Sequence, residues 1–127
     1  MDRQRVCLWT GGGFEIWNDQ IWFVPHWVNA LCCFDRKSGQ LEKMVRIPGI
    51  TTASAGFHNL KKTGNRIVLI PAFERSLYLY DMDTGRIHAV GPQLTLCALE
   101  KFQECIQWND SLYLFPFGYD CIIRLDM

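Results

Sequence analysis

The chain has 127 residues, of which 49% are hydrophobic and 13% aromatic, so it carries enough apolar material to bury the core of one domain. Thirteen basic residues balance thirteen acidic ones, which argues against a nucleic-acid partner, because nucleic acid binds to a basic face. No apolar run approaches the length of a membrane span, and residues 6–9 are too short for the apolar core of a signal peptide. We therefore expect no membrane partner and a cytoplasmic location, unless the chain is a fragment of a secreted protein.

A first repeat is expected over residues approximately 14–49. The apolar run 21–24 is of strand length, and the turn-forming pair Asn18-Asp19 precedes it. Pro25 closes the run, as expected at a strand end, because proline cannot donate to a β-ladder.

A second repeat is expected over residues approximately 57–92, with the same order of turn residues, apolar run and closing proline. Pro71 lies 46 residues after Pro25 and closes the run 67–70, which follows Gly64-Asn65. Short segments rich in β-branched and aromatic residues predict four strands, termed a to d. These strands are expected at residues 57–62, 66–71, 76–81 and 86–90.

A third repeat is expected over residues approximately 102–127, where Pro116 lies 45 residues after Pro71. Residues 98–105 are mostly good helix formers, but the repeat register places the second half of this stretch on strand a. The run 121–125 is expected to be strand c, so strand d of this repeat is missing.

The repetition predicts the fold class. Aspartates keep the same step of 46 and then 45 residues, at Asp35, Asp81 and Asp126. A period between 20 and 50 residues marks solenoids, propellers and arrays, and four strands in about 45 residues match one propeller blade. We predict an all-β protein, a single β-propeller-like domain over residues 1–127. It consists of four-stranded antiparallel blades, about three of them, in an incomplete ring, because closure takes about 4–8 blades.

Residues 76–87, Ser-Leu-Tyr-Leu-Tyr-Asp-Met-Asp-Thr-Gly-Arg-Ile, resemble the third strand and turn of the kelch or galactose-oxidase-type propeller repeat. Quinoprotein-type repeats share the Asp…Thr-Gly ending, so a second propeller subfamily also fits. The resemblance implies that the b–c loops and the d–a connections emerge together on one rim, where propellers usually carry their function.

The b–c loops therefore supply the candidate binding residues. The loops at residues 25–29, 71–75 and 116–120 each hold an aromatic residue beside a polar or charged group. Flat apolar area with fixed hydrogen-bond partners suits a protein or glycan ligand. The alternative is that these aromatic side chains close the space between neighbouring blades. The candidate residues are His26, Trp27, Phe73, Glu74, Arg75, Phe117, Tyr119 and Asp120.

The sequence singles out no catalytic residue, metal site or cofactor. Acid pairs for glycoside hydrolysis could be assembled from Glu15, Glu74, Glu104 and Asp120, but nothing in the pattern selects one. His58 on strand a is interpreted as a polar residue at a strand edge, with a ligand or base as the alternative. The six cysteines contain no C-x-x-C spacing and are predicted to be buried thiols.

These patterns favour a non-catalytic binding or scaffold module over the alternative, part of a glycan-active hydrolase, lyase or oxidase. An incomplete ring leaves apolar faces in water. We therefore expect either that two copies join into a six-bladed ring or that the chain is part of a longer propeller. In the first case, the apolar segment 5–9 could pair with the open edge of the third blade in another copy.

Overall fold

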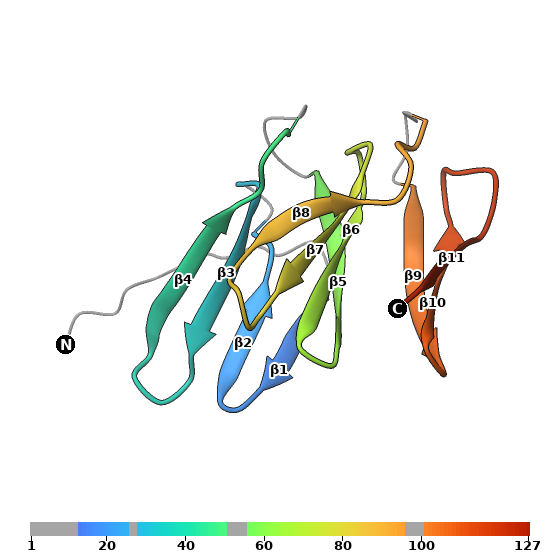
Figure 1. Ribbon diagram of the computed structural model, residues 1–127. Coiled ribbons are helices and arrows are strands. Elements are labelled where there is room, and N and C mark those ends of the chain that lie inside the picture. Colours follow the sequence, from blue (N-terminus) through green and yellow to red (C-terminus); the bar gives the residue numbers. More distant parts are fainter. Residues whose placement is uncertain (1–12, 26–27, 51–55, 96–100) are drawn as a thin grey trace.

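The computed structural model describes residues 13–25, 28–50, 56–95 and 101–127 (Figure 1). Their strands form three antiparallel sheets, in which each strand pairs with its neighbour in the chain. The first blade contains β1 (Glu15–Trp17), β2 (Gln20–Phe23), β3 (Ala30–Asp35) and β4 (Gln40–Arg46). The second contains β5 (Phe57–Thr63), β6 (Arg66–Pro71), β7 (Leu77–Asp81) and β8 (Ile87–Val90). The third contains β9 (Phe102–Trp108), β10 (Ser111–Pro116) and β11 (Ile123–Asp126).

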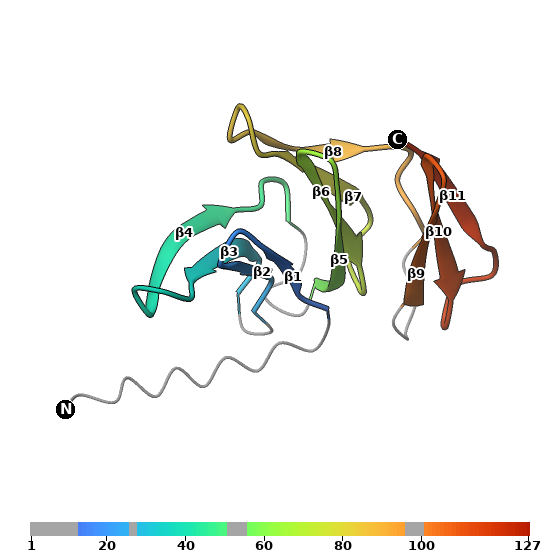
Figure 2. The same ribbon diagram turned by 90° about the horizontal axis from the view of Figure 1, so that it is seen from below.

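The predicted fold class is confirmed. The three sheets fan out in an arc, with the first strand of each blade on the inside and the last strand on the outside (Figure 2). The described blades do not close a ring, and the third blade lacks a fourth strand within the described residues. The stretch of helix formers joins the sheet from Phe102 onward as β9, because the register of the repeat and its pairing with β10 override local propensity.

The repeated turn residues are explained by their backbone conformations. Asn18 (φ 49°), Asn109 (φ 54°) and Gly64 (φ 57°) take left-handed conformations in the tight turns between the first two strands of each blade. Asparagine and glycine adopt this region more readily than other residues. The turns that the sequence predicts at these three places are confirmed.

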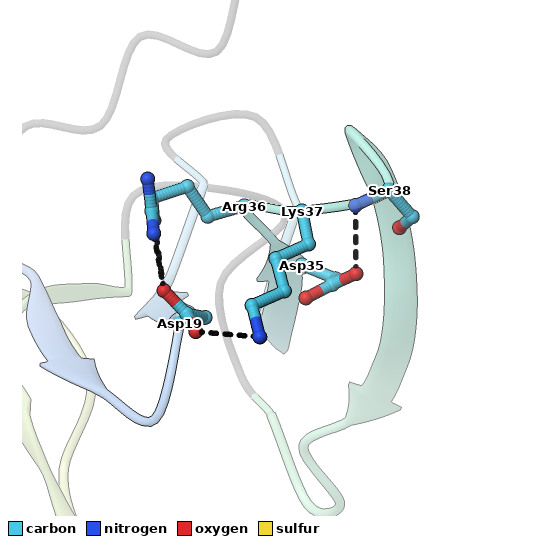
Figure 3. A network of polar contacts seen from close by, with 5 residues as sticks. All are labelled: Asp19, Asp35, Arg36, Lys37 and Ser38. Atoms are coloured by element: carbon cyan, nitrogen blue, oxygen red, sulfur yellow. Dashed lines mark hydrogen bonds and ion pairs between the residues drawn. The ribbon is translucent and has the colours of Figure 1, made fainter.

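The repeated aspartates hold the turn between the third and fourth strands. Asp35 Oδ2 accepts a hydrogen bond from the Ser38 amide at 2.9 Å (Figure 3), and Asp81 Oδ1 accepts from the amides of Asp83 and Thr84 at 2.8 and 3.1 Å. In the first blade the turn is tied further to Asp19, whose Oδ1 lies 2.6 Å from Arg36 Nη2 (Figure 3). Hydrogen bonding to the charged form lowers the pKa of Asp35, and the contacts with Arg36 and Lys37 lower that of Asp19.

Packing between blades forms two seams, because the central strand β6 buries both of its faces. On β6, Ile67 and Leu69 point into the first seam, between the first and second blades, and Val68 and Ile70 point into the second seam, between the second and third blades. The first seam buries Trp22, Val24, Leu31, Cys33, Ile47, Phe57, Leu60, Ile67, Leu69, Tyr78 and Tyr80. The second seam buries Val68, Ile70, Leu77, Leu94, Phe102, Leu112 and Leu114.

The prediction of buried cysteines is only partly right. Cys32 and Cys33 are buried on opposite faces of β3, and burial raises the pKa of each thiol to about 11. Cys105 is half-buried on β9, and Cys121 is exposed. The burial expected of Cys121 is wrong because β11 begins only at Ile123, which leaves Cys121 in the preceding loop. Cys7 and Cys97 lie outside the described residues.

Candidate binding rim

The loops between the second and third strands of the second and third blades lie at one end of the molecule, at the top in Figure 1, and together form the candidate binding rim. In the second blade this loop covers residues 72–76, and in the third it covers residues 117–122. His26 and Trp27, the candidates from the first blade, lie outside the described residues.

Backbone hydrogen bonds tie each rim loop to the residue that precedes the first strand of its own blade. The Gly56 carbonyl accepts from the amides of Ala72, Phe73 and Glu74 at 2.8, 3.2 and 3.2 Å. One period later, the Lys101 carbonyl accepts from the amides of Phe117 and Tyr119 at 2.8 and 3.3 Å.

The same two residues also bind the preceding blade. The Gly56 amide donates to Asn29 Oδ1 at 3.1 Å, and the Lys101 amide donates to the Ala72 carbonyl at 3.0 Å. Each rim loop is therefore connected to the next by a continuous chain of hydrogen bonds. This relay makes the rim a fixed part of the seams, although loops are usually the more mobile parts of a fold.

Two of the predicted site residues take part in packing. Glu74 is 2% exposed and Tyr119 is half-buried, with its ring centroid 5.5 Å from that of Phe102. The carboxylate of Glu74 acts on Tyr78: burial first, and then this negative charge, raises the pKa of the Tyr78 phenol. The Tyr78 hydroxyl donates to the Pro48 carbonyl, in the connection between the first two blades.

Four predicted residues are open to solvent to different degrees. Phe117 is 57% exposed, and Arg75 and Asp120 are also exposed. Phe73 is half-buried, and its carbonyl accepts a hydrogen bond from Lys101 Nζ at 3.3 Å. The structure thus leaves an aromatic ring, a cation and a carboxylate accessible on loops whose backbone is held in place.

The residues that build the relay were missed by the sequence reasoning. Lys101 is fully buried beside the rim, although lysine is almost never fully buried unless it is paired. Gly56 and Lys101 occupy equivalent positions in the repeat but have different side chains. The side chain can differ because the hydrogen bonds of the relay are made by the backbone N–H and C=O. The 45-residue step between them was the only signal that could have found the pair.

Two cavities lie between the second and third blades, away from the predicted rim. One of about 400 Å³ is lined by Thr63, Gly64, Asn65, Arg66, Asp81, Asp83, Asp110 and Met127. The other, of about 380 Å³, is lined by Arg66, Leu79, Asp81, His88, Val90, Leu125, Asp126 and Met127. Three of the carboxylates there have structural partners: Asp81 accepts backbone amides, Asp83 Oδ2 accepts from Asn65 Nδ2 at 3.1 Å, and Asp126 Oδ1 accepts from Ser111 Oγ at 2.7 Å.

The acids considered for glycoside hydrolysis have different environments. Glu74 is buried, Glu15 is half-buried, and Glu104 and Asp120 are exposed. Among the described residues, no group of three or more histidine, cysteine, aspartate or glutamate side chains is arranged to hold a metal ion. In the same ranges, no helix is long and apolar enough to cross a membrane.

Four-stranded antiparallel blades arranged around an inner row of first strands define a β-propeller fold. The chain is similar to solved structures. Virginiamycin B lyase from Staphylococcus aureus is similar over 93% of this chain and 42% of its own, with a TM-score of 0.63 and 14% identity. The N-terminal domain of Nup159 is similar over 91% of this chain and 30% of its own, with a TM-score of 0.47 and 13% identity. No family model matches the chain, and no curated protein sequence matches it.

The likeness to the lyase shows the fold alone, because the two sequences are 14% identical. The chain spans less than half the length of either of these solved chains.

Proposed function

We propose that this chain is a non-catalytic binding or scaffold module of the kelch-like type, which recognises a protein or glycan through the rim loops. The observation that supports this function is the contrast between backbone and side chains on the rim. The amide of Phe117 is fixed on the Lys101 carbonyl at 2.8 Å, while its ring is 57% exposed.

A fixed loop binds at lower entropic cost than a mobile one, because little conformational freedom is lost on binding. Aromatic and arginine side chains carry much of the binding energy at protein interfaces, and aromatic faces also stack on sugar rings. Phe117 and Arg75 supply these groups, and Asp120 adds a hydrogen-bond acceptor. Tyr119 contributes by supporting the third-blade loop through its contact with Phe102.

The test compares Phe117→Ala with Leu41→Ala. Leu41 is 47% exposed on β4, the outer strand of the first blade, so its removal matches the lost apolar area without touching the rim. The wild-type chain is screened against a displayed peptide library and an array of defined oligosaccharides, and any binder is titrated against both variants.

We expect Phe117→Ala to weaken the selected binder at least tenfold with an unchanged melting temperature, and Leu41→Ala to bind like the wild type. Equal affinity of all three chains would show that the rim is not the binding surface. Selection from the peptide library or from the oligosaccharide array distinguishes a protein ligand from a glycan.

The alternative is that the chain is part of a glycan-active propeller enzyme. A lyase is among the solved structures that share the fold, and this likeness motivates the alternative without identifying a reaction. Of the four acids considered for this reaction, Glu104 and Asp120 are the two that are exposed. Cleavage of an oligosaccharide by the wild-type chain that is abolished in Asp120→Asn would favour the enzyme over the binding module.

A further inference from the structure

Each blade has a leading face toward the preceding blade and a trailing face toward the following one. Within the described residues, the leading face of the first blade and the trailing face of the third blade contact no other sheet. The leading face of the first blade carries a cluster of Phe23, Ala30 and Cys32 that is already buried within the single chain. Leu41 and Met44 extend it, because they pair with Phe34 and Cys32, and they are 47% and 44% exposed.

The open trailing face belongs to β9 and β10. Leu112 and Leu114 point into the second seam, so the intervening Tyr113 and the following Phe115 point to the other side. Ile106 and Trp108 share that side, because Ile106 pairs with Tyr113 and Trp108 alternates with Ile106. Ile106 is 52% exposed and Trp108 is 69% exposed.

The two formed seams use one pair of positions in the same way. At the first seam, Lys62 Nζ lies 4.7 Å from the ring centroid of Trp17. At the second, Gln107 Nε2 donates to Thr63 Oγ1 at 3.4 Å. In both seams the contact joins equivalent positions of the inner strands. The last residue of one blade's inner strand, Trp17 or Thr63, contacts the next-to-last residue of the following blade's inner strand, Lys62 or Gln107.

The two open faces carry the same pair of strand positions, and both positions hold large hydrophobic residues. The last residue of β9 is Trp108, and the next-to-last residue of β1 is Ile16. Among the described residues these are the two most exposed large hydrophobic side chains, at 69% and 72%. At these positions the first seam pairs a tryptophan with a lysine and the second pairs a threonine with a glutamine, whereas the open faces present a tryptophan and an isoleucine.

A second pair of equivalent positions also matches the trailing face of the third blade to the leading face of the first. Trp22 and Tyr80 meet across the first seam with ring centroids 5.6 Å apart. Their equivalents in the second seam, Val68 and Leu125, belong to one apolar cluster. The next equivalents are Tyr113 on the trailing face of the third blade and Phe34 on the leading face of the first, both half-buried.

We propose that the trailing face of the third blade docks on the leading face of the first blade of a second copy. Trp108 then contacts Ile16, and Tyr113 contacts Phe34. A two-fold axis makes both new contacts identical, and the two copies together form a closed ring of six blades. This blade number lies within the range of about 4–8 that closed propellers use. The interface continues the geometry of the two existing seams and does not depend on the function proposed for the rim.

The experiment measures the mass of the 14.8 kDa chain by light scattering after size-exclusion chromatography. We expect the wild type to elute at twice the chain mass. Trp108→Lys and Ile16→Glu each place a charge against an apolar residue in both contacts, so each should weaken association at least tenfold. Both residues are exposed in the single chain, so circular dichroism should show native folding for each variant.

Mixing the two variants provides the decisive measurement. In a dimer of one Trp108→Lys chain and one Ile16→Glu chain, one contact joins the two substituted side chains, whose charges are opposite. The other contact retains Trp108 and Ile16. Association should therefore recover. Phe117→Lys adds a positive charge to an exposed rim residue on neither face and should leave the mass unchanged. A wild-type monomer at all concentrations, assemblies larger than a pair, or no recovery on mixing would each overturn the proposal.

Discussion

Replacing Gly49 with alanine tests how the first seam is anchored. Gly49 lies between β4 and β5 with φ of 68°, and a Cβ there would lie 3.3 Å from the Tyr78 hydroxyl oxygen. A residue other than glycine loses about 1–2 kcal/mol in this left-handed region. Displacing the hydroxyl would also weaken its hydrogen bond to the Pro48 carbonyl, which contributes about 0.5–1.5 kcal/mol. We therefore expect Gly49→Ala to lower the free energy of unfolding by about 1.5–3.5 kcal/mol.

Gly85 provides the matched control, because its φ is 71° and nothing lies within 4 Å of a Cβ built there. Gly85→Ala should therefore lose only the backbone contribution, about 1–2 kcal/mol. The two glycine variants are compared by urea unfolding followed by circular dichroism, each with Tyr78 and with Tyr78→Phe. The difference between them should shrink in the Tyr78→Phe background. Equal losses with Tyr78 present, or a difference that persists in Tyr78→Phe, would refute the steric explanation.

Three further predictions concern other parts of the fold. Cys121 should react with iodoacetamide at pH 8 well before Cys32, whose pKa of about 11 leaves roughly one thiolate in a thousand, and peptide mapping by mass spectrometry would show the order. Asp19→Asn should lower stability at pH 7, and this loss should shrink as the pH falls below 3.8 and through the lowered folded-state pKa, because the stability that the charged form contributes is fully present only above 3.8; equal urea midpoints at pH 7 would contradict this. Leu69→Ala, in the first seam, should lower the free energy of unfolding by about 2–5 kcal/mol, and a loss under about 1 kcal/mol would contradict its burial.

The strands could be predicted because the turn residues repeat for a physical reason. Asp35 and Asp81 bind the amides of the turn that follows them, and Gly39 and Gly85 close those turns at φ of 70° and 71°. In the second blade, the strands predicted at 66–71 and 86–90 are found at Arg66–Pro71 and Ile87–Val90. The loop before β11 was not predicted, because the apolar run 121–125 has the composition of a strand throughout.

The candidate site could be located only as far as the loops that hold it. Composition does not distinguish a glutamate that faces the interior, such as Glu74, from an exposed acid such as Asp120. The relay through Gly56 and Lys101 uses main-chain groups, which leave little trace in the choice of side chain. His26 and Trp27 stay predictions.

The turn residues are alike from blade to blade, but the residues that join one blade to the next differ. This difference indicates what each blade face contacts. The pair at the inner strand ends is Trp17 with Lys62, then Thr63 with Gln107, and each includes a polar group that can also bind water. Trp108 and Ile16 expose mostly apolar area, and exposed apolar area destabilises by about 25 cal/mol per Å² relative to burial. Large, mainly apolar side chains at both members of this pair, where each formed seam includes a lysine, threonine or glutamine, are what an interface that must exclude water requires.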